Sequence, residues 1–349
     1  MRALPAAALS ASFLLFASTG VRAQEAENAS PPAPVFEFHS GFWVNLHHFL
    51  YLQGRIRQGS LAGVRAEVGI PSPYRALAST EGLTAEQQHA WRAAVEVYAQ
   101  SWSSRDLLLN NQMVLINDRL AELEDCPDLA GKNAAQCTSG IVPDLVAALD
   151  QAAPIYRQRW WPEQDRSNRA WIAAMTPLLR NGGAELAGDL AEIYQSKWPL
   201  RIHVDVVYYA GPQGAYASLA PPHLTIATAL SRNQNTTGFE TLFYESSRTV
   251  GGAVEQAIER ECRRLQKPIP RDLWNAVLLY TTRDRIGRPG SGAQPRADAV
   301  SRSLQRGNGN NLRDRGWGDY QPLLEQYWQP YLDGRIEMDT AVAHLINAI

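Results

Sequence analysis

The sequence lacks several features that would assign a protein to a class at once. Beyond residue 23 no run approaches 18 apolar residues, so no later segment is predicted to span a bilayer. Its 33 Lys and Arg are balanced by 35 Asp and Glu, and the formal net charge of −2 gives no basic footprint for nucleic acid. There is no Gly-x-Ser-x-Gly elbow, and Gly251-Gly252 is not followed by the Lys-Ser/Thr of a phosphate loop. These absences argue against integral membrane proteins, nucleic-acid binders, serine hydrolases and P-loop nucleotidases.

The first 23 residues are typical of a secretory signal. Arg2 supplies a positive start, residues 6–17 form an apolar core, and Val21-Arg22-Ala23 forms a small-x-small cleavage site. That core is too short to span a bilayer stably. We therefore expect an exported protein, periplasmic or extracellular, with no stable membrane span after signal cleavage. Residues 24–35, small, polar and proline-bearing, are predicted to form a flexible leader.

Cysteine is scarce, with three in 349 residues. Export permits disulfides, and Cys126 and Cys137 flank a loop containing Pro, Gly and Asn, so we predict that they pair. Cys262 is left over in a charged segment with no His nearby in sequence. A free, packed thiol is therefore expected there rather than a nucleophile.

The hydrophobic pattern predicts an α+β fold that is mainly α. Residues 36–200 have apolar positions at helical spacing, and Thr84 with Gln87 has the pattern of a capping box. From Arg201 the period changes to two, which predicts a small sheet at the start of a second region, 201–349. Residues 286–314, rich in Gly, Asn, Ser and Arg, are predicted to be a mobile loop. Helices are expected at 42–56, from Thr84, at 105–123, from Pro143, from Pro154, at 171–179, 185–194, 238–250, 272–279, 317–331 and 338–346, and strands at 201–209, 215–219 and 224–228.

The segment Tyr244-Glu245-Ser246-Ser247-Arg248 lies in the helix expected at 238–250. In zinc hydrolases such a helix carries His-Glu-x-x-His, because residues four apart share one face and both imidazoles reach one metal while the Glu acts as general base. A protonated phenol and a permanently charged guanidinium are not zinc ligands. Only Glu245 remains, as a vestigial general base. The alternative interpretation is an ordinary amphipathic helix in which Glu245 pairs with Arg248 for a few tenths of a kcal/mol.

The wider chain resembles a family of secreted bacterial proteins that look like zincin metallopeptidases. In that family the middle block usually reads Leu-Phe-His-Glu-Ala-Ser-His, the next helix carries a His where this chain has Asn275, and a Glu follows where it has Arg283-Asp284. The resemblance covers most of residues 36–349. It rests on five blocks in the same order: 38–51, 222–227, 242–248, 272–282 and 328–334.

The resemblance implies a zincin-like fold in which a short sheet precedes the motif helix and its edge strand pairs with an extended peptide. Residues 223–227 are the candidate edge strand, with an ordinary core strand as the competing assignment. Zinc belongs to the family pattern, but the loss of two imidazoles predicts that this chain holds no cofactor there. Asn275 and Asp284 are expected in the cleft because they match family positions.

We therefore predict an exported zincin-like pseudopeptidase that binds an extended peptide or another cell-envelope ligand, with Arg248 replacing the positive charge of a metal near Glu245. An active metallohydrolase is the alternative, with His47, His48, His223 and Asp284 as relocated ligands and Glu245 as base. His203 or His223 would then stabilise an oxyanion. A two-carboxylate hydrolase using Glu245 with Asp284, and a purely structural envelope protein, are further alternatives.

Overall fold

The computed structural model describes residues 35–59, 79–123, 126–129, 137–211, 213–219, 221–288 and 311–349. The predicted signal at 1–23, residues 24–34 of the predicted leader and residues 289–310 of the predicted mobile loop lie outside the described residues. All described residues belong to one compact unit. Within the described part of the chain, no helix is both long enough and apolar enough to cross a membrane.

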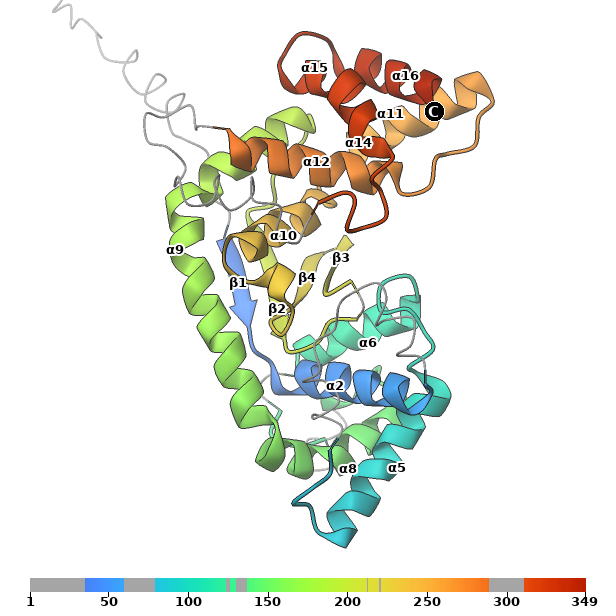
Figure 1. Cartoon of the computed structure of the whole chain (residues 1–349). Helices are drawn as coiled ribbons and strands as arrows, with labels where there is room; N and C mark the ends of the chain where they lie inside the picture. Colours follow the sequence, from blue (N-terminus) through green and yellow to red (C-terminus); the bar gives the residue numbers. More distant parts are fainter. Residues whose placement is uncertain are drawn as a thin grey trace, which may run out of the picture. The chain divides into compact units, whose positions relative to one another are not determined.

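A four-stranded sheet organises the described chain (Figure 1). Its order is β1 (Val35–His39), β2 (Arg201–Val207), β4 (Pro222–Ala227) and β3 (Ala215–Leu219). The first three strands are parallel, and β3 pairs antiparallel with β4. His203 is opposite Glu37 on one side and His223 on the other. Because side chains alternate along a strand, one face of the sheet is apolar and the other carries His and Asp side chains.

The first set of helices packs into one apolar cluster that includes the ends of β2 and β4. Within it α2 contacts α5, α6 and α8, and α5 contacts α8. The long helix α9 continues from this set past the β1 side of the sheet (Figure 1, light green). The bounds are α2 Phe42–Arg57, α5 Ala85–Ser101, α6 Asn111–Ala121, α8 Pro143–Arg159 and α9 Trp161–Ile193.

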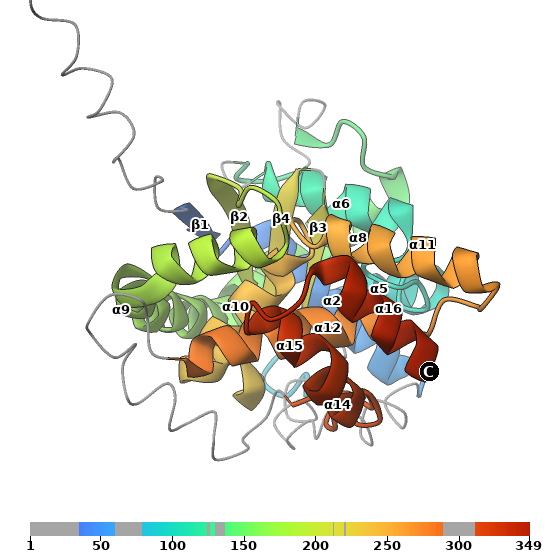
Figure 2. The same ribbon diagram turned by 90° about the horizontal axis from the view of Figure 1, so that it is seen from above.

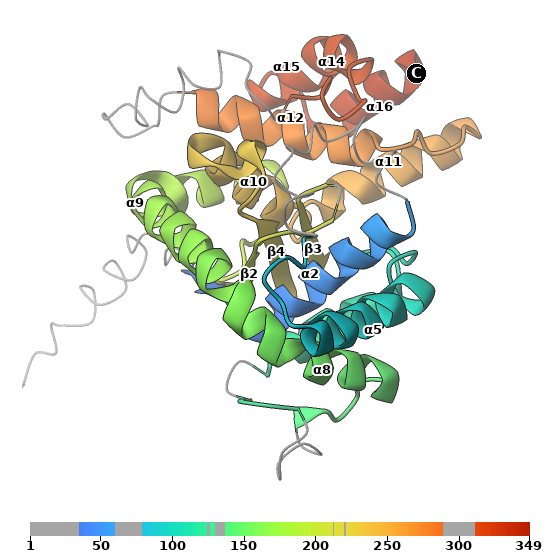
Figure 3. The ribbon, with the colours of Figure 1, turned by 60° about the horizontal axis from the view of Figure 1, so that its bottom comes forward.

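The second set packs with α9 on the apolar face of the sheet, in a separate cluster. There α10 contacts β3, β4, α9 and α12, and α11 lies against α16. Figures 2 and 3 show these later helices, orange to red, gathered around α12. The bounds are η1 Ser231–Asn233, α10 Asn235–Ser247, α11 Gly252–Leu265, α12 Leu273–Gly287, α14 Tyr320–Leu323, the π-helical η2 Leu324–Trp328, α15 Gln329–Leu332 and α16 Met338–Ala348.

Several predictions of local structure are confirmed. The fold is α+β and mainly α, with one small sheet. Cys126 and Cys137 form a disulfide, and Cys262 is a buried free thiol. Thr84 and Gln87 form a reciprocal capping box at the start of α5. Capping and spacing signals of this kind are local, which is why they can be found from sequence.

Two helix starts were predicted wrongly, each for a different reason. The Asp106 carboxylate accepts hydrogen bonds from the N–H groups of Leu108 and Leu109 at 2.8 and 2.7 Å, and Asn110 then caps α6. The helix predicted from 105 therefore begins at 111. Pro154 does not open a helix but lies inside α8, where the buried residues that follow it keep the helix in the core.

The segments predicted at 171–179 and 185–194 are one continuous helix, α9, that runs through Gly182 and Gly183. Conversely, the helix expected at 238–250 ends at Ser247, and α11 starts at Gly252. Gly251 lies at this break, where an added Cβ would meet a Leu278 methyl carbon at 2.7 Å. Close packing against α12 thus requires glycine at this position.

Strand predictions were right in number for the second region and incomplete for the first. β3 has the predicted bounds, and β2 and β4 lie at the predicted places. β1 was not predicted, because five residues next to the expected leader give little periodic signal. β4 is a central strand paired on both sides, so 223–227 is not an edge strand, whereas β3 is.

Candidate functional site

The sequence-predicted site on α10 is a closed set of polar groups. The Arg248 guanidinium donates from Nε to Glu245 Oε2 at 2.9 Å and from Nη2 to the Tyr244 hydroxyl at 3.1 Å. Helical spacing brings these side chains together, since they lie three and four residues apart. Tyr244 and Glu245 are buried and Arg248 is largely so. The positions that would carry two imidazoles are therefore bonded to one another around a cation.

The neighbours of Arg248 favour its charged form. Burial opposes the charge on Arg248, but the Glu245 carboxylate and the Tyr244 hydroxyl outweigh burial, so the pKa of the guanidinium lies above its ordinary value. Burial also raises the pKa of Tyr244, so the phenol stays protonated. This set therefore offers zinc no free ligand, because the phenol of Tyr244 is neutral, Arg248 is a cation and the carboxylate of Glu245 is bonded to Arg248.

A second buried carboxylate lies one turn earlier on α10. Glu240 is fully buried, and its Oε1 is 3.9 Å from Nε of Arg283 on α12. Burial raises its pKa to about 7, while the charges of Arg283 and Arg315 act in the opposite direction. Glu240 could not be singled out from the sequence, because a lone Glu in a helix is usually solvent-exposed.

An open groove of about 540 Å³ lies next to this set. Arg315 connects the two, because it lines the groove and its guanidinium lies 4.8 Å from the centre of the Tyr244 ring. The other lining residues mix aromatic, apolar and charged groups: Arg271, Asp272, Gly316, Trp317, Asp319, Tyr320, Leu323 and Ile349. A volume of this size is within the range of small-ligand pockets.

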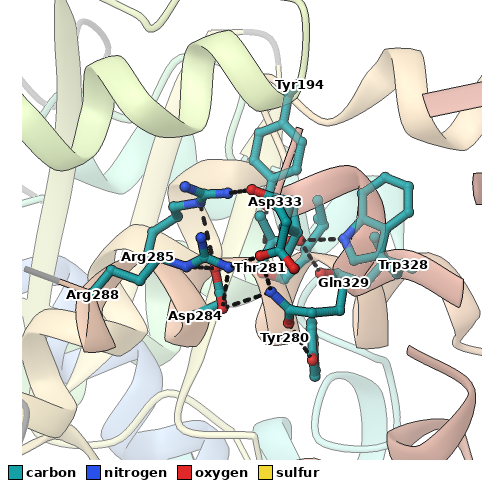
Figure 4. Close-up of polar contacts among 12 residues, drawn as sticks. Tyr194, Tyr280, Thr281, Asp284, Arg285, Arg288, Trp328, Gln329 and Asp333 are labelled. Atoms are coloured by element: carbon teal, nitrogen blue, oxygen red, sulfur yellow. Dashed lines mark hydrogen bonds and ion pairs between the residues drawn. The ribbon is translucent and has the colours of Figure 1, made fainter. Parts of the chain in front are cut away.

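Asn275 and Asp284 have bonding partners away from the Glu245 pair. Asn275, in the first turn of α12, donates to Asp272 at 3.3 Å. Asp284, near the other end of α12, pairs with Arg288 at 2.8 Å and accepts from Gln329 at 3.2 Å (Figure 4). Figure 4 shows the side chains of Asp284 and Arg288 beside that of Gln329, so this set joins α12 to α15. Glu245 bonds Arg248, and Asp284 bonds Arg288 and Gln329. The two carboxylates therefore do not form the pair that a two-carboxylate mechanism needs.

His47 and His48 are buried in the other apolar cluster, on α2. His47 Nδ1 lies 2.8 Å from the Tyr98 hydroxyl, and His48 Nε2 lies 2.8 Å from the Tyr216 hydroxyl. Burial lowers the pKa of both, that of His48 to about 4, so both imidazoles are neutral near pH 7. His48 Nδ1 also bonds the Val44 carbonyl, so the partners of these two imidazoles are core tyrosines and helix backbone.

The most concentrated group of titratable side chains lies on the polar face of the sheet. His203 and Asp205 lie two residues apart on the same face of β2, and His223 of β4 stands opposite His203. Asp205 Oδ2 lies 2.7 Å from His223 Nε2, and Asp205 Oδ1 lies 3.1 Å from His203 Nε2. Asp118 of α6 reaches the other nitrogen of His223, Nδ1, at 2.9 Å. We call His203, Asp205 and His223 the sheet cluster.

Hydrogen bonding in the sheet cluster outweighs the cost of burial. Burial acts against the charge on His223, but Asp118 and Asp205 outweigh it and raise the pKa of His223 to about 9. Burial would raise the pKa of Asp205, but bonds from His203 and His223 lower it to about 2. His39 of β1 stacks on His203 with ring centres 4.2 Å apart, which limits rotation of that imidazole.

Within the described residues, the sheet cluster is the one group of at least three His, Cys, Asp or Glu side chains whose ligand atoms all lie within 4.8 Å of one another. The relocated ligand set of His47, His48, His223 and Asp284 is therefore not brought together. His223 belongs to a different group, with Asp205 and Asp118, neither of which sequence reasoning selected. The signal that could have found Asp205 is its position two residues after His203, which places both side chains on the same face of β2.

Comparison with known proteins adds no relative to these observations. No protein-family model matches the chain, and no curated protein or solved structure is significantly similar to it.

Proposed function

We propose that this chain is an exported, zincin-like pseudopeptidase that binds an extended peptide beside α10 without cleaving it. One observation carries the proposal: the Arg248 guanidinium bonds both Glu245 and Tyr244. A general base must be able to take a proton from water positioned by a metal. The Glu245 carboxylate is instead bonded to the guanidinium, and neither Tyr244 nor Arg248 is a metal ligand that could hold such a water beside it.

The arrangement around α10 is consistent with the expected peptide-binding architecture. The small sheet precedes α10, and within the described chain its edge strand β3 has a strand partner on one side only. Edge strands of this kind are where extended peptides add by main-chain pairing. Leu219 at the end of β3 is about half exposed, so this end of the edge is accessible.

The groove next to α10 supplies side-chain contacts of the type that peptides need. Trp317 offers an aromatic surface, while Arg315 and Asp319 offer opposite charges. Mixed lining of this kind suits a peptide better than a uniformly charged ligand. The occupant assigned to this groove is accordingly a short extended peptide of mixed polarity.

A random seven-residue peptide library displayed on phage tests the proposal. Peptides selected on the natural protein should bind in fluorescence anisotropy and remain intact by mass spectrometry after long incubation. Arg315→Ala should weaken binding about 10-fold or more, a typical loss for a central contact. The exposed neighbour Arg313 provides the matched control, Arg313→Ala, with unchanged binding expected. Cleavage of the selected peptide, or failure to select any, would contradict the proposal.

A further inference from the structure

The sheet cluster has the donor set of a transition-metal site. It combines two imidazoles and one carboxylate, the His₂-carboxylate combination found in catalytic zinc sites. Each oxygen of the buried Asp205 carboxylate faces one imidazole nitrogen, Nε2 of His203 or Nε2 of His223. We infer that His203, Asp205 and His223 form a binding site for one zinc-class divalent cation on the polar face of the sheet.

The distances between the donor atoms are close to those that a bound ion requires. Zinc binds nitrogen and oxygen at about 2.0–2.2 Å, which places neighbouring tetrahedral ligands about 3.4 Å apart. The two donor pairs that share Asp205 are 3.1 and 2.7 Å apart, and all three donors lie within 4.8 Å of one another. Side-chain shifts below about 1 Å convert the hydrogen-bonded group into a coordination set once both Nε2 atoms are free of protons. His223 then releases its Nε2 proton to solvent and keeps the Nδ1 proton that faces Asp118, while His203 carries its proton on Nδ1, so zinc binding releases protons.

Asp118 supplies the outer contact that such sites use. Its Oδ1 accepts a hydrogen bond from His223 Nδ1 at 2.9 Å. This bond fixes the imidazole so that Nε2 faces Asp205. A carboxylate bound to the remote nitrogen fixes the orientation of a metal-binding imidazole and raises its basicity. His39 restrains the second imidazole by stacking on it. Both histidines are thus held by groups outside the ligand set.

The cluster is deep but reachable. Asp205 and His223 are buried, whereas about 30% of the His203 side chain is exposed. An ion can enter from the His203 side, and the three protein ligands leave a fourth tetrahedral position there for water or another ligand. Imidazole donors favour zinc and its first-row neighbours over Mg²⁺ or Ca²⁺, which take oxygen ligands.

This site is independent of the proposed peptide function. Ile202 and Val204 alternate with the cluster residues along β2 and face the apolar cluster that contains α10. The metal site and the Arg248 set therefore lie on opposite faces of the sheet, and one can fail without the other.

Equilibrium dialysis of the full mature protein, stripped with EDTA and titrated with Zn²⁺ alone, tests the inference. The natural protein should bind about one equivalent, and His203→Asn should weaken affinity about 100-fold or more while circular dichroism stays unchanged. Asp118→Asn should weaken it about 10- to 100-fold, because the orienting carboxylate is lost. His89→Asn is the matched control, since His89 is exposed on α5, and should bind zinc like the natural protein.

Binding below about 0.1 equivalent at 10-fold excess zinc, or unchanged affinity in a folded His203→Asn variant, would show a purely hydrogen-bonded cluster and overturn the inference. If His203→Asn does not fold, Co²⁺ in the natural protein decides. Intense visible absorption of four- or five-coordinate Co²⁺ is expected, and the weak spectrum of six-coordinate aqueous Co²⁺ would overturn it.

Discussion

The two faces of the sheet solve the burial of charge in different ways. On the α10 side, Arg248 and Glu245 come from a single helix and neutralise each other three residues apart. On the polar face, Asp118, Asp205 and His223 come from a helix and two strands and form a chain of bonds. The Arg248–Glu245 pair satisfies its polar groups with neighbours in sequence. The bonds of the polar face instead bring imidazole nitrogens and carboxylate oxygens from β2 and β4 close to one another. On this difference rest our two proposals, peptide binding without a metal on the α10 side and metal binding on the polar face.

The largest expected effect comes from opening the Arg248 set. Arg248→Ala leaves the Glu245 carboxylate buried without its cation, and removing one partner of a buried pair costs about 3–5 kcal/mol. Urea unfolding of the variant and of the exposed control Arg313→Ala measures the difference. The control should change by less than about 0.5 kcal/mol. A loss below about 1 kcal/mol in Arg248→Ala would show that the set is not closed as described.

Glu240 sharpens the comparison through pH. Its pKa in the folded state, about 7, lies above its ordinary 4.5, so the folded chain keeps a proton that the unfolded chain releases between these values. Its contribution therefore makes the protein less stable as pH rises from 4.5 through 7, by up to about 3 kcal/mol. Glu240→Gln should remove this loss, and the variant should be the more stable protein at pH 8 and little changed at pH 4.

The measurement is the free energy of unfolding at pH 4, 6 and 8, with the exposed Glu255→Gln on α11 as control. The control should follow the natural protein. Parallel pH profiles for Glu240→Gln and the natural protein would contradict this prediction. They would mean that burial does not raise the pKa of Glu240 in the folded protein.

Asp118 tests the long-range bonds of the polar face. Asp118→Asn replaces a charged acceptor at His223 Nδ1 by a neutral amide. A hydrogen bond between charged groups contributes about 1.5–3 kcal/mol at most, and partial exposure of Asp118 reduces the expected loss to about 1 kcal/mol. Guanidinium-induced unfolding without metal measures it. An unchanged midpoint would show that the Asp118–His223 bond contributes nothing measurable to holding α6 on the sheet.

The smallest effect is expected at the rim of the polar face. Arg201 pairs with Glu37 at 2.7 Å, but the Arg201 side chain is exposed and that of Glu37 is only partly buried. Exposed pairs contribute between zero and about 1 kcal/mol, so Arg201→Ala should change the free energy of unfolding by less than about 0.5 kcal/mol. Thermal unfolding at low and high salt measures it. A larger loss that depends on salt would show that the Arg201–Glu37 pair is coupled to the buried charges of the sheet cluster.

What could be predicted from the sequence follows the same division between local and long-range structure. The capping box at Thr84, the disulfide of Cys126 with Cys137 and strand β3 depend on neighbours in sequence, and all are found. The α10 pair could likewise be named in advance, because helical spacing alone brings Glu245 to Arg248.

The sheet cluster could not be assembled in this way. Its geometry needs the register of β2 against β4, which depends on tertiary packing, and the approach of α6, whose start was displaced by the Asp106 turn. His203 and His223 could each be selected from the sequence as single candidates. Asp205 and Asp118 could be linked to them only once the register of β2 against β4 was known. Glu240 was missed for a related reason, because its burial depends on α12.

The most direct test of the account is the zinc content of three purified proteins: the natural chain, His203→Asn and Glu245→Gln. If the two faces divide their roles as described, the natural chain and Glu245→Gln each carry about one equivalent and His203→Asn carries less than about 0.1. Zinc retained in His203→Asn and lost in Glu245→Gln would place the metal at α10 and contradict the central claim.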